Sequence, residues 1–223
     1  MIYFLHYQTF KLKFKRGIDM KFKKVGLMIS ALLMTVGLVG CGAANLPEGD
    51  VKIVNQQVSG VIGLLLESAD YGPDQSTVAS MVLPTGSSYD INMTVEQYEN
   101  GELVNTIEVP TYTTDTMEKN SIVHMILNIG QDDVKSIFSI AEVDSEKTTD
   151  QKNPEYKLTK TNAPAINFEQ RVAIDQYGGE LNKDVVLAAY TTGGSAAITL
   201  DNYQDQVTNY TAVSVVKVNI AQK

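Results

Sequence analysis

The stretch YDINMTVEQYENGELVNTIEV, residues 89–109, contains the clearest structural pattern in the chain. Apolar residues from Tyr89 to Val95 alternate with polar ones, which gives a β-strand one buried face and one solvent-exposed face. A second alternating run follows, and the Asn-Gly pair between the two runs is a turn signal. The stretch therefore predicts an antiparallel hairpin that covers one side of a hydrophobic core.

The length of the loop in this hairpin follows from the pairing of side chains. A two-residue turn at 100–101 would set apolar residues of the first strand opposite polar residues of the second. A three-residue loop over 99–101, with Gly101 in the left-handed conformation, restores apolar pairs such as Met93 with Ile107. We therefore expect the three-residue loop.

Similar short runs, rich in Val, Ile, Thr and Tyr and separated by Gly, Pro, Asn and Asp, fill the chain beyond residue 50. Such runs are typical of strands, and no stretch keeps a helical period. The best helical candidate, 201–210, is short and polar, so one turn or a loop is expected there. Strands are predicted near 51–58, 60–68, 77–83, 88–98, 103–110, 121–130, 134–143, 166–175, 185–192, 196–200 and 211–220.

These strands predict an all-β fold class, an antiparallel two-sheet β-sandwich that is Ig-like in general architecture. We expect one domain over 51–223 with a polar excursion at 144–165. A division into 51–143 and 166–223 is the alternative, although the second part is short for an independent sandwich.

The residues before this domain have the parts of an export signal. From Met20, MKFKKVGLMISALLMTVGLVGC has a basic start, an apolar run and small residues before Cys41. The apolar run is shorter than the roughly 20 residues that cross a bilayer comfortably. We expect residues 1–40 to be a cleaved, helical signal segment, followed by a tether over 41–50. The expected true start is Met20, and the alternative is that residues 1–19 lengthen the basic region of the signal.

The end of this segment, Leu38, Val39, Gly40 and Cys41, resembles the lipobox of bacterial lipoproteins. The resemblance covers about 22 residues and implies that Cys41 receives a diacylglyceryl group and becomes the new N-terminus. It also implies a cell-membrane location on the extracytoplasmic face, held by palmitate-like acyl chains. Two such chains suffice for stable attachment.

The charge of the chain is divided at the same point. Seven of the 18 basic and one of the 26 acidic residues lie before Cys41, which leaves 11 basic and 25 acidic residues, a net of −14. A nucleic-acid partner would need a basic surface, so none is expected. The expected partners are the membrane, through the lipid, and a protein, peptide or glycan at the cell surface.

Candidate catalytic and metal groups are few beyond Cys41. His124 is expected to be a largely buried, hydrogen-bonded imidazole on a strand face, and a catalytic pairing with Ser195 is disfavoured because Gly193-Gly194 is typical of a turn. One Cys and one His cannot make a usual zinc site. Asp201 and Asp205 are weak calcium candidates. No other cofactor is expected.

The sequence thus favours a membrane-anchored, non-catalytic binding or scaffolding protein. The alternatives are a hydrolase that uses carboxylates alone and a small-solute receptor of a transporter. Nine tyrosines beyond residue 70 are expected to cap the sandwich ends with their hydroxyls in water, or else to form a platform for carbohydrate or peptide.

Overall fold

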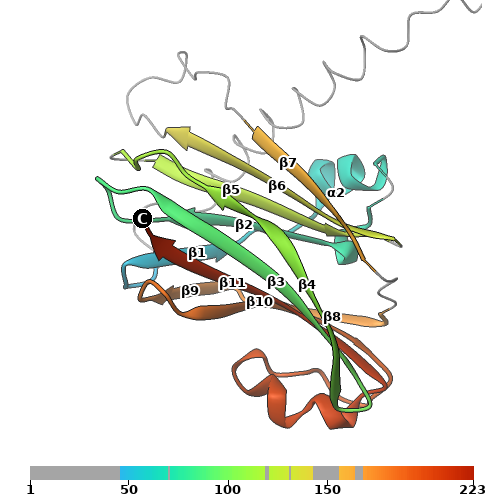
Figure 1. Cartoon of the computed structure of the whole chain (residues 1–223). Helices are drawn as coiled ribbons and strands as arrows, with labels where there is room; N and C mark the ends of the chain where they lie inside the picture. The colour runs from blue at the N-terminus through green and yellow to red at the C-terminus, as the bar shows by residue number, and fades with distance from the viewer. Residues whose placement is uncertain (1–45, 70, 119–120, 131, 143–155, 164–167) are drawn as a thin grey trace, which may run out of the picture.

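The computed structural model describes residues 46–69, 71–118, 121–130, 132–142, 156–163 and 168–223. Two antiparallel sheets pack face to face (Figure 1), which confirms the predicted all-β sandwich. In spatial order the six-stranded sheet contains β7 (Tyr156–Asn162), β6 (Asp133–Glu142), β5 (Ser121–Ile129), β2 (Ser76–Val82), β1 (Val51–Asn55) and β9 (Gln176–Gly179). The five-stranded sheet contains β4 (Glu102–Thr113), β3 (Tyr89–Glu99), β11 (Ala212–Gln222), β10 (Asp184–Thr192) and β8 (Gln170–Ala173).

Each sheet combines strands that are far apart in the sequence. β1 lies between β2 and β9, and β11 lies between β3 and β10. Strands from both sides of residues 143–155 are therefore hydrogen-bonded to one another in both sheets.

The core between the sheets is aliphatic. Alternate residues of the inner strands face inward, as the period of two in a strand requires, and they are at most 2% exposed. The six-stranded sheet contributes mainly Val51, Ile53, Met81, Val123, Met125 and Leu127, and the five-stranded sheet contributes Ile91, Met93, Val95, Val216 and Val218.

The hairpin of β3 and β4 has a two-residue turn, so the predicted three-residue loop is wrong. Asn100 and Gly101 both have positive φ, 49° and 89°, as the tight turns of hairpins require. The pairing shifts by one residue between Gln97 and Tyr98, because β4 has an extra residue at this point. This bulge places Val95 opposite Ile107 and restores the apolar pairs that a regular two-residue hairpin would lose.

Four other parts differ from the predicted strands. β8 covers Gln170–Ala173 of the strand predicted at 166–175, and β9 (Gln176–Gly179) is a separate strand beyond it. Residues 60–68, expected to be extended, contain the helix α2 (Gly60–Glu67). Residues 196–200 form no strand and lead into η3 (Leu200–Asp205) and η4 (Val207–Asn209), the short turns expected near 201–210. Tyr156–Asn162, inside the predicted polar excursion, form the edge strand β7, because an edge strand needs only one hydrogen-bonded partner and can remain polar.

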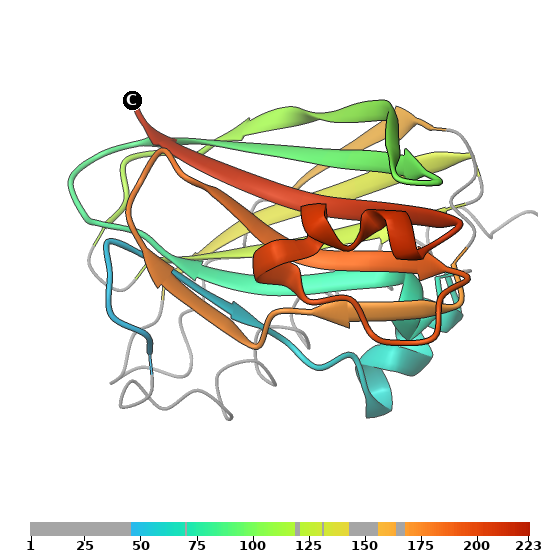
Figure 2. The same cartoon turned by 90° about the horizontal axis from the view of Figure 1, so that it is seen from below.

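A second apolar cluster lies on the outer face of the five-stranded sheet. Residues 193–211 connect β10 to β11 and include η3 and η4, which lie on one side of this sheet (Figure 2). Their buried side chains, Ile198, Leu200, Tyr203, Val207 and Tyr210, pack on Ala189, Val213 and Val215. We call residues 198–210 the outer cover.

Candidate functional site

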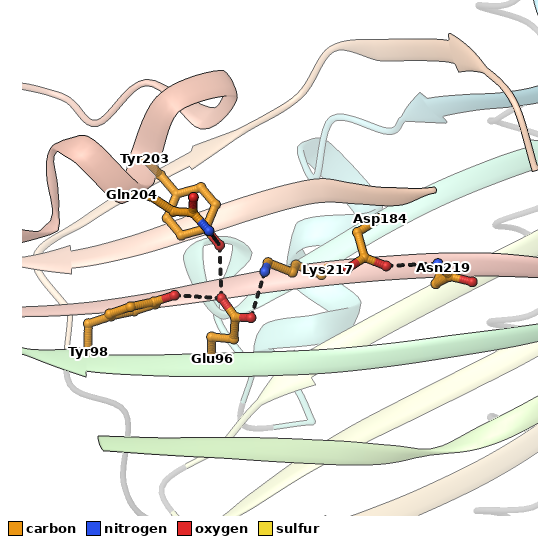
Figure 3. Close-up of polar contacts among 7 residues, drawn as sticks. All are labelled: Glu96, Tyr98, Asp184, Tyr203, Gln204, Lys217 and Asn219. Atoms are coloured by element: carbon orange, nitrogen blue, oxygen red, sulfur yellow. Dashed lines mark hydrogen bonds and ion pairs between the residues drawn. The ribbon is translucent and has the colours of Figure 1, made fainter. Parts of the chain in front are cut away.

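The most connected group of charged side chains lies where the outer cover meets the sheet (Figure 3). Glu96 on β3 accepts hydrogen bonds from Lys217 at 2.6 Å, from the hydroxyl of Tyr98 at 2.8 Å and from that of Tyr203 at 2.9 Å. Glu96 follows the buried Val95, and Lys217 lies between two buried valines, so the period of two in a strand turns both side chains away from the core. We call these four residues the Glu96 cluster.

The tyrosine rings shield the ion pair from water. Tyr98 and Tyr203 meet edge to face with centroids 6.1 Å apart, and the ammonium of Lys217 lies 5.4 Å from the Tyr203 ring centroid. The side chains of Glu96 and Lys217 are only 18% and 14% exposed. Such a pair is held more firmly than a fully exposed ion pair, which contributes little to the free energy of unfolding.

The protonation states in the Glu96 cluster are fixed at neutral pH. Burial opposes ionisation of Glu96, but the hydrogen bonds from Lys217, Tyr98 and Tyr203 outweigh it and lower the pKa of this carboxyl. Partial burial also disfavours the charge on Lys217, yet its interactions with Glu96 and Tyr203 together outweigh this effect and raise the pKa of the ammonium. Burial, reinforced by the bond to Glu96, raises the pKa of the Tyr98 hydroxyl far above its usual value.

The chemical role of the Glu96 cluster follows from these states. A carboxylate with three donors and a lowered pKa is a poor general acid or base, because both roles need a proton affinity near the working pH. Tyr203 belongs to the outer cover, whereas Glu96 and Lys217 belong to the sheet. The cluster therefore fastens the outer cover to the sheet, and Asp184 and Asn219 form a separate, exposed hydrogen bond of 2.8 Å further along (Figure 3).

A second polar group joins the two sheets inside the sandwich. The hydroxyls of Thr77 on β2 and Tyr190 on β10 lie 3.0 Å apart, and Arg171 on β8 donates to Thr77 at 3.3 Å. Tyr190 is 1% exposed and also meets Phe168 edge to face at 4.9 Å. Buried hydroxyls that satisfy each other in this way fix the relative position of the sheets.

The lone histidine of the described residues lies on the outer face of the six-stranded sheet. His124 Nδ1 is 3.0 Å from Ser80 Oγ, so the predicted hydrogen-bonded imidazole is confirmed. Burial lowers its pKa, which keeps the ring neutral. Ser195 is exposed in the connection that follows β10 of the other sheet, so the structure does not bring it to His124.

The calcium candidates Asp201 and Asp205 are both exposed on η3. In the part of the chain that the structure describes, no group of three or more His, Cys, Asp or Glu side chains is arranged to hold a metal ion. The lipobox residues Leu38, Val39, Gly40 and Cys41 lie outside the described residues.

The tyrosines differ from the expected end caps. Tyr71, Tyr89, Tyr190, Tyr203 and Tyr210 are at most 8% exposed. Several hydroxyls have protein partners: those of Tyr89 and Tyr210 donate to the carbonyls of Pro84 and Ala196, at 3.0 Å and 2.7 Å. These side chains belong to the core, to the outer cover and, for Tyr71, to a small separate cluster with Leu66. Their spacing along the chain could not reveal partners up to 113 residues away.

The end of the tether is held against the edge strand β9. A Cβ atom on Gly178 would overlap the carbonyl oxygen of Glu48 and would lie 2.9 Å from the Cβ of Pro47. Gly49 contacts the backbone of Gly179 in the same way. Residues 47–49 therefore pack on β9 through glycine, where the two backbones approach more closely than other residues allow.

Comparison with known proteins gives one family match. A family model described as the YgaN domain matches residues 70–178, a little less than half of the chain. The match begins before β2 and ends within β9, so it includes strands of both sheets and omits β1, β10 and β11. No curated protein and no solved structure matches the chain.

Proposed function

We propose that this chain is a lipid-anchored, extracytoplasmic β-sandwich protein of the non-catalytic binding or scaffolding type. The observation that carries the proposal is the lipobox-like LVGC at 38–41, combined with the short distance from Cys41 to the folded body. Because residues 47–49 pack on β9, only residues 42–46 are left as a linker. An extended chain of this length reaches about 20 Å.

A linker of this length determines where a partner would be met. It would hold the sandwich against the outer face of the cytoplasmic membrane, within reach of proteins, peptides and glycans at that surface. Among the described residues, no helix is long and apolar enough to cross a bilayer. In the proposed protein, attachment depends on the acyl chains at Cys41.

The Glu96 cluster supports a non-catalytic role. Its carboxylate, ammonium and hydroxyls are already hydrogen-bonded to one another. Groups committed to each other in this way stabilise the fold and have little capacity left to transfer a proton to a substrate.

Two measurements test the proposal. Mass spectrometry of the mature chain should find a diacylglyceryl group on Cys41, and Cys41→Ala should move the protein out of the membrane fraction. Pull-down from detergent extracts of cells should then enrich a partner with the wild type and not with Cys41→Ala. A free thiol at Cys41, or a turnover activity without an enriched partner, contradicts the proposal.

A further inference from the structure

The helix α2 is more apolar than its position in the fold requires. Its sequence, GVIGLLLE, has a single charged residue, Glu67. It is attached to the body by Leu66, which packs with Tyr71 and Val58 in a small cluster apart from the main core. A helix that is apolar around most of its circumference normally lies inside a protein or against lipid.

The side of α2 that faces away from the body contains Leu64. This leucine is 66% exposed, more than the other large exposed apolar side chains of the described residues, Leu103, Val104 and Leu158. Leu65 beside it is half-buried. Exposed apolar surface of this kind marks a contact with something outside the molecule.

The position of α2 relates it to the tether. Residues 46–50 and α2 lie at the two ends of the same long side of the sandwich, opposite β4 (Figure 2). They are joined by β1, whose five residues span about 17 Å, and by residues 56–59. A membrane that holds the lipid of Cys41 within about 20 Å of Pro47 can therefore also reach α2.

We infer that α2 is a membrane-contacting helix whose Leu64 side enters the bilayer interface beside the lipid anchor. This inference rests on the proposed anchoring at Cys41. The anchor makes a small contact sufficient, because it confines α2 near the surface at a high effective concentration. A short apolar helix at the interface buries its apolar side about 5 to 10 Å into the boundary between headgroups and acyl chains.

A protein partner fits this surface less well. α2 has eight residues and is about 12 Å long. A stable interface buries about 800 Å² on each partner, and one exposed side of so short a helix supplies only a small part of that area. A second copy of the chain is disfavoured for the same reason.

Electrostatic attraction is not the basis of the contact. Lys135 lies 4.6 Å from the Tyr71 ring centroid, and Lys160 forms a 2.8 Å ion pair with Asp133. Glu67 and Asp74 are close to α2 in sequence and add negative charge. Because the nearby lysines already have partners and the charge from Cys41 onward is −14, the contact should be no stronger on anionic than on zwitterionic vesicles, and on zwitterionic vesicles it should resist salt.

The test uses the full, lipidated chain reconstituted into phosphatidylcholine vesicles. Since the lipid occupies the Cys41 sulfur, Leu64→Cys supplies a single free thiol for an environment-sensitive fluorophore. Leu103→Cys is the matched control, because Leu103 is 53% exposed and lies in the β3–β4 hairpin. With spin-labelled lipids in the vesicles, we expect quenching at position 64 to exceed quenching at position 103 several-fold.

The outcomes separate this inference from the proposed anchoring. Equal quenching at the two positions, in protein that floats with the vesicles, overturns the membrane contact and leaves the anchor intact. Failure of the wild type to float with the vesicles contradicts the anchor itself. Protection of position 64 from maleimide in cells, without quenching in vesicles, also overturns the inference, since a protein would then cover α2.

Discussion

Lys217 and Glu96 are joined across two neighbouring strands: the Lys217 ammonium lies 2.6 Å from a carboxylate oxygen of Glu96, and both side chains are less than one-fifth exposed. Removing one charge from such a pair leaves the other partly buried without a partner. Glu96→Gln should therefore lower the free energy of unfolding by about 2 to 3 kcal/mol, measured by urea denaturation.

A double-mutant cycle measures the interaction energy between Glu96 and Lys217 apart from the other contacts of the Glu96 cluster. Glu96→Gln combined with Lys217→Met should cost less than the sum of the single changes, because no unpaired charge remains. Asp184→Asn, in an exposed hydrogen-bonded pair, is the control and should cost no more than about 0.5 kcal/mol. Additive costs at Glu96 and Lys217 would show that the ion pair is not coupled.

The same pair predicts how stability depends on pH. The pKa of Glu96 is lower in the folded protein, so its contribution is complete above the unfolded value near 4.3 and is lost as the pH falls through the folded pKa. The pKa of Lys217 is raised, so its contribution is complete below about 10.4 and is lost as the pH rises through the folded pKa. The contribution of this pair should be level from about pH 5 to 10, whereas the lowered pKa of the buried His124 makes total stability fall as the pH drops below about 6.5.

Glu96→Gln should reduce the loss of stability in acid without abolishing it. Asp133 remains in the variant, and the hydrogen bond from Lys160 lowers the pKa of its carboxyl as well. Denaturant midpoints between pH 2 and 7 measure the difference. Identical acid profiles for the wild type and the variant would contradict the role given to Glu96.

Of the two tyrosines in the Glu96 cluster, only Tyr203 should hold the outer cover on the sheet. Tyr98→Phe and Tyr203→Phe each remove one hydroxyl bond to Glu96, and each should cost about 1.5 kcal/mol. Only Tyr203 lies in the outer cover, so only Tyr203→Phe should accelerate amide hydrogen exchange over residues 198–210. Equal exchange in the two variants would mean that the cluster does not fasten the cover.

The contact between the tether and β9 should depend on Gly178. In Gly178→Ala the new methyl group meets the Glu48 carbonyl, so residues 47–49 must leave the strand. We expect a loss of about 1 to 3 kcal/mol and faster cleavage at Glu48 by a Glu-specific protease. Gly72→Ala is the control, since its nearest contact, at 3.6 Å, is ordinary; equal cleavage in the two variants would show that Gly178 does not seat the tether.

Alanine substitutions at Gly86 and Gly101 distinguish the cost of backbone strain from the cost of a steric clash with a neighbouring side chain. Gly101 and Gly86 both have positive φ, but only a Cβ on Gly101 would meet another side chain, Thr208 at 2.6 Å. Gly86→Ala should cost about 1 to 2 kcal/mol from the backbone alone, and Gly101→Ala should cost more. Thr208→Ser should recover part of the difference in thermal unfolding, and no recovery would exclude the contact as its cause.

Local patterns in the sequence predicted the sandwich because short runs of Val, Ile, Thr and Tyr recur between turn residues and because β3 alternates clearly between buried and more exposed positions. The length of the loop at Asn100-Gly101 was predicted wrongly because the pattern of apolar and polar residues does not show the bulge in β4. α2 was missed because a run of seven uncharged, mostly apolar residues does not distinguish a helix from a buried strand. Three leucines and the preceding Ser59 were the available helical signals.

The Glu96 cluster could not be predicted from spacing. Two of its residues, Tyr203 in the outer cover and Lys217 on β11, lie 107 and 121 positions from Glu96 along the chain. Only the order of strands, with β11 between β3 and β10, brings them together. That order depends on pairing between strands that are far apart in the chain, and the local patterns of a single sequence do not specify this pairing.

The position of β11 in the sheet also determines the order in which the strands can pair during folding. Its residues, 212–222, come more than a hundred positions after β3, yet they separate β3 from β10. In a chain that is synthesised N-terminus first, β3 can pair with β4 and β10 with β8, but the edges of β3 and β10 that pair with β11 stay open until those late residues are made. Closure of the five-stranded sheet therefore waits for the last strand, and until then these open edges can pair with other chains.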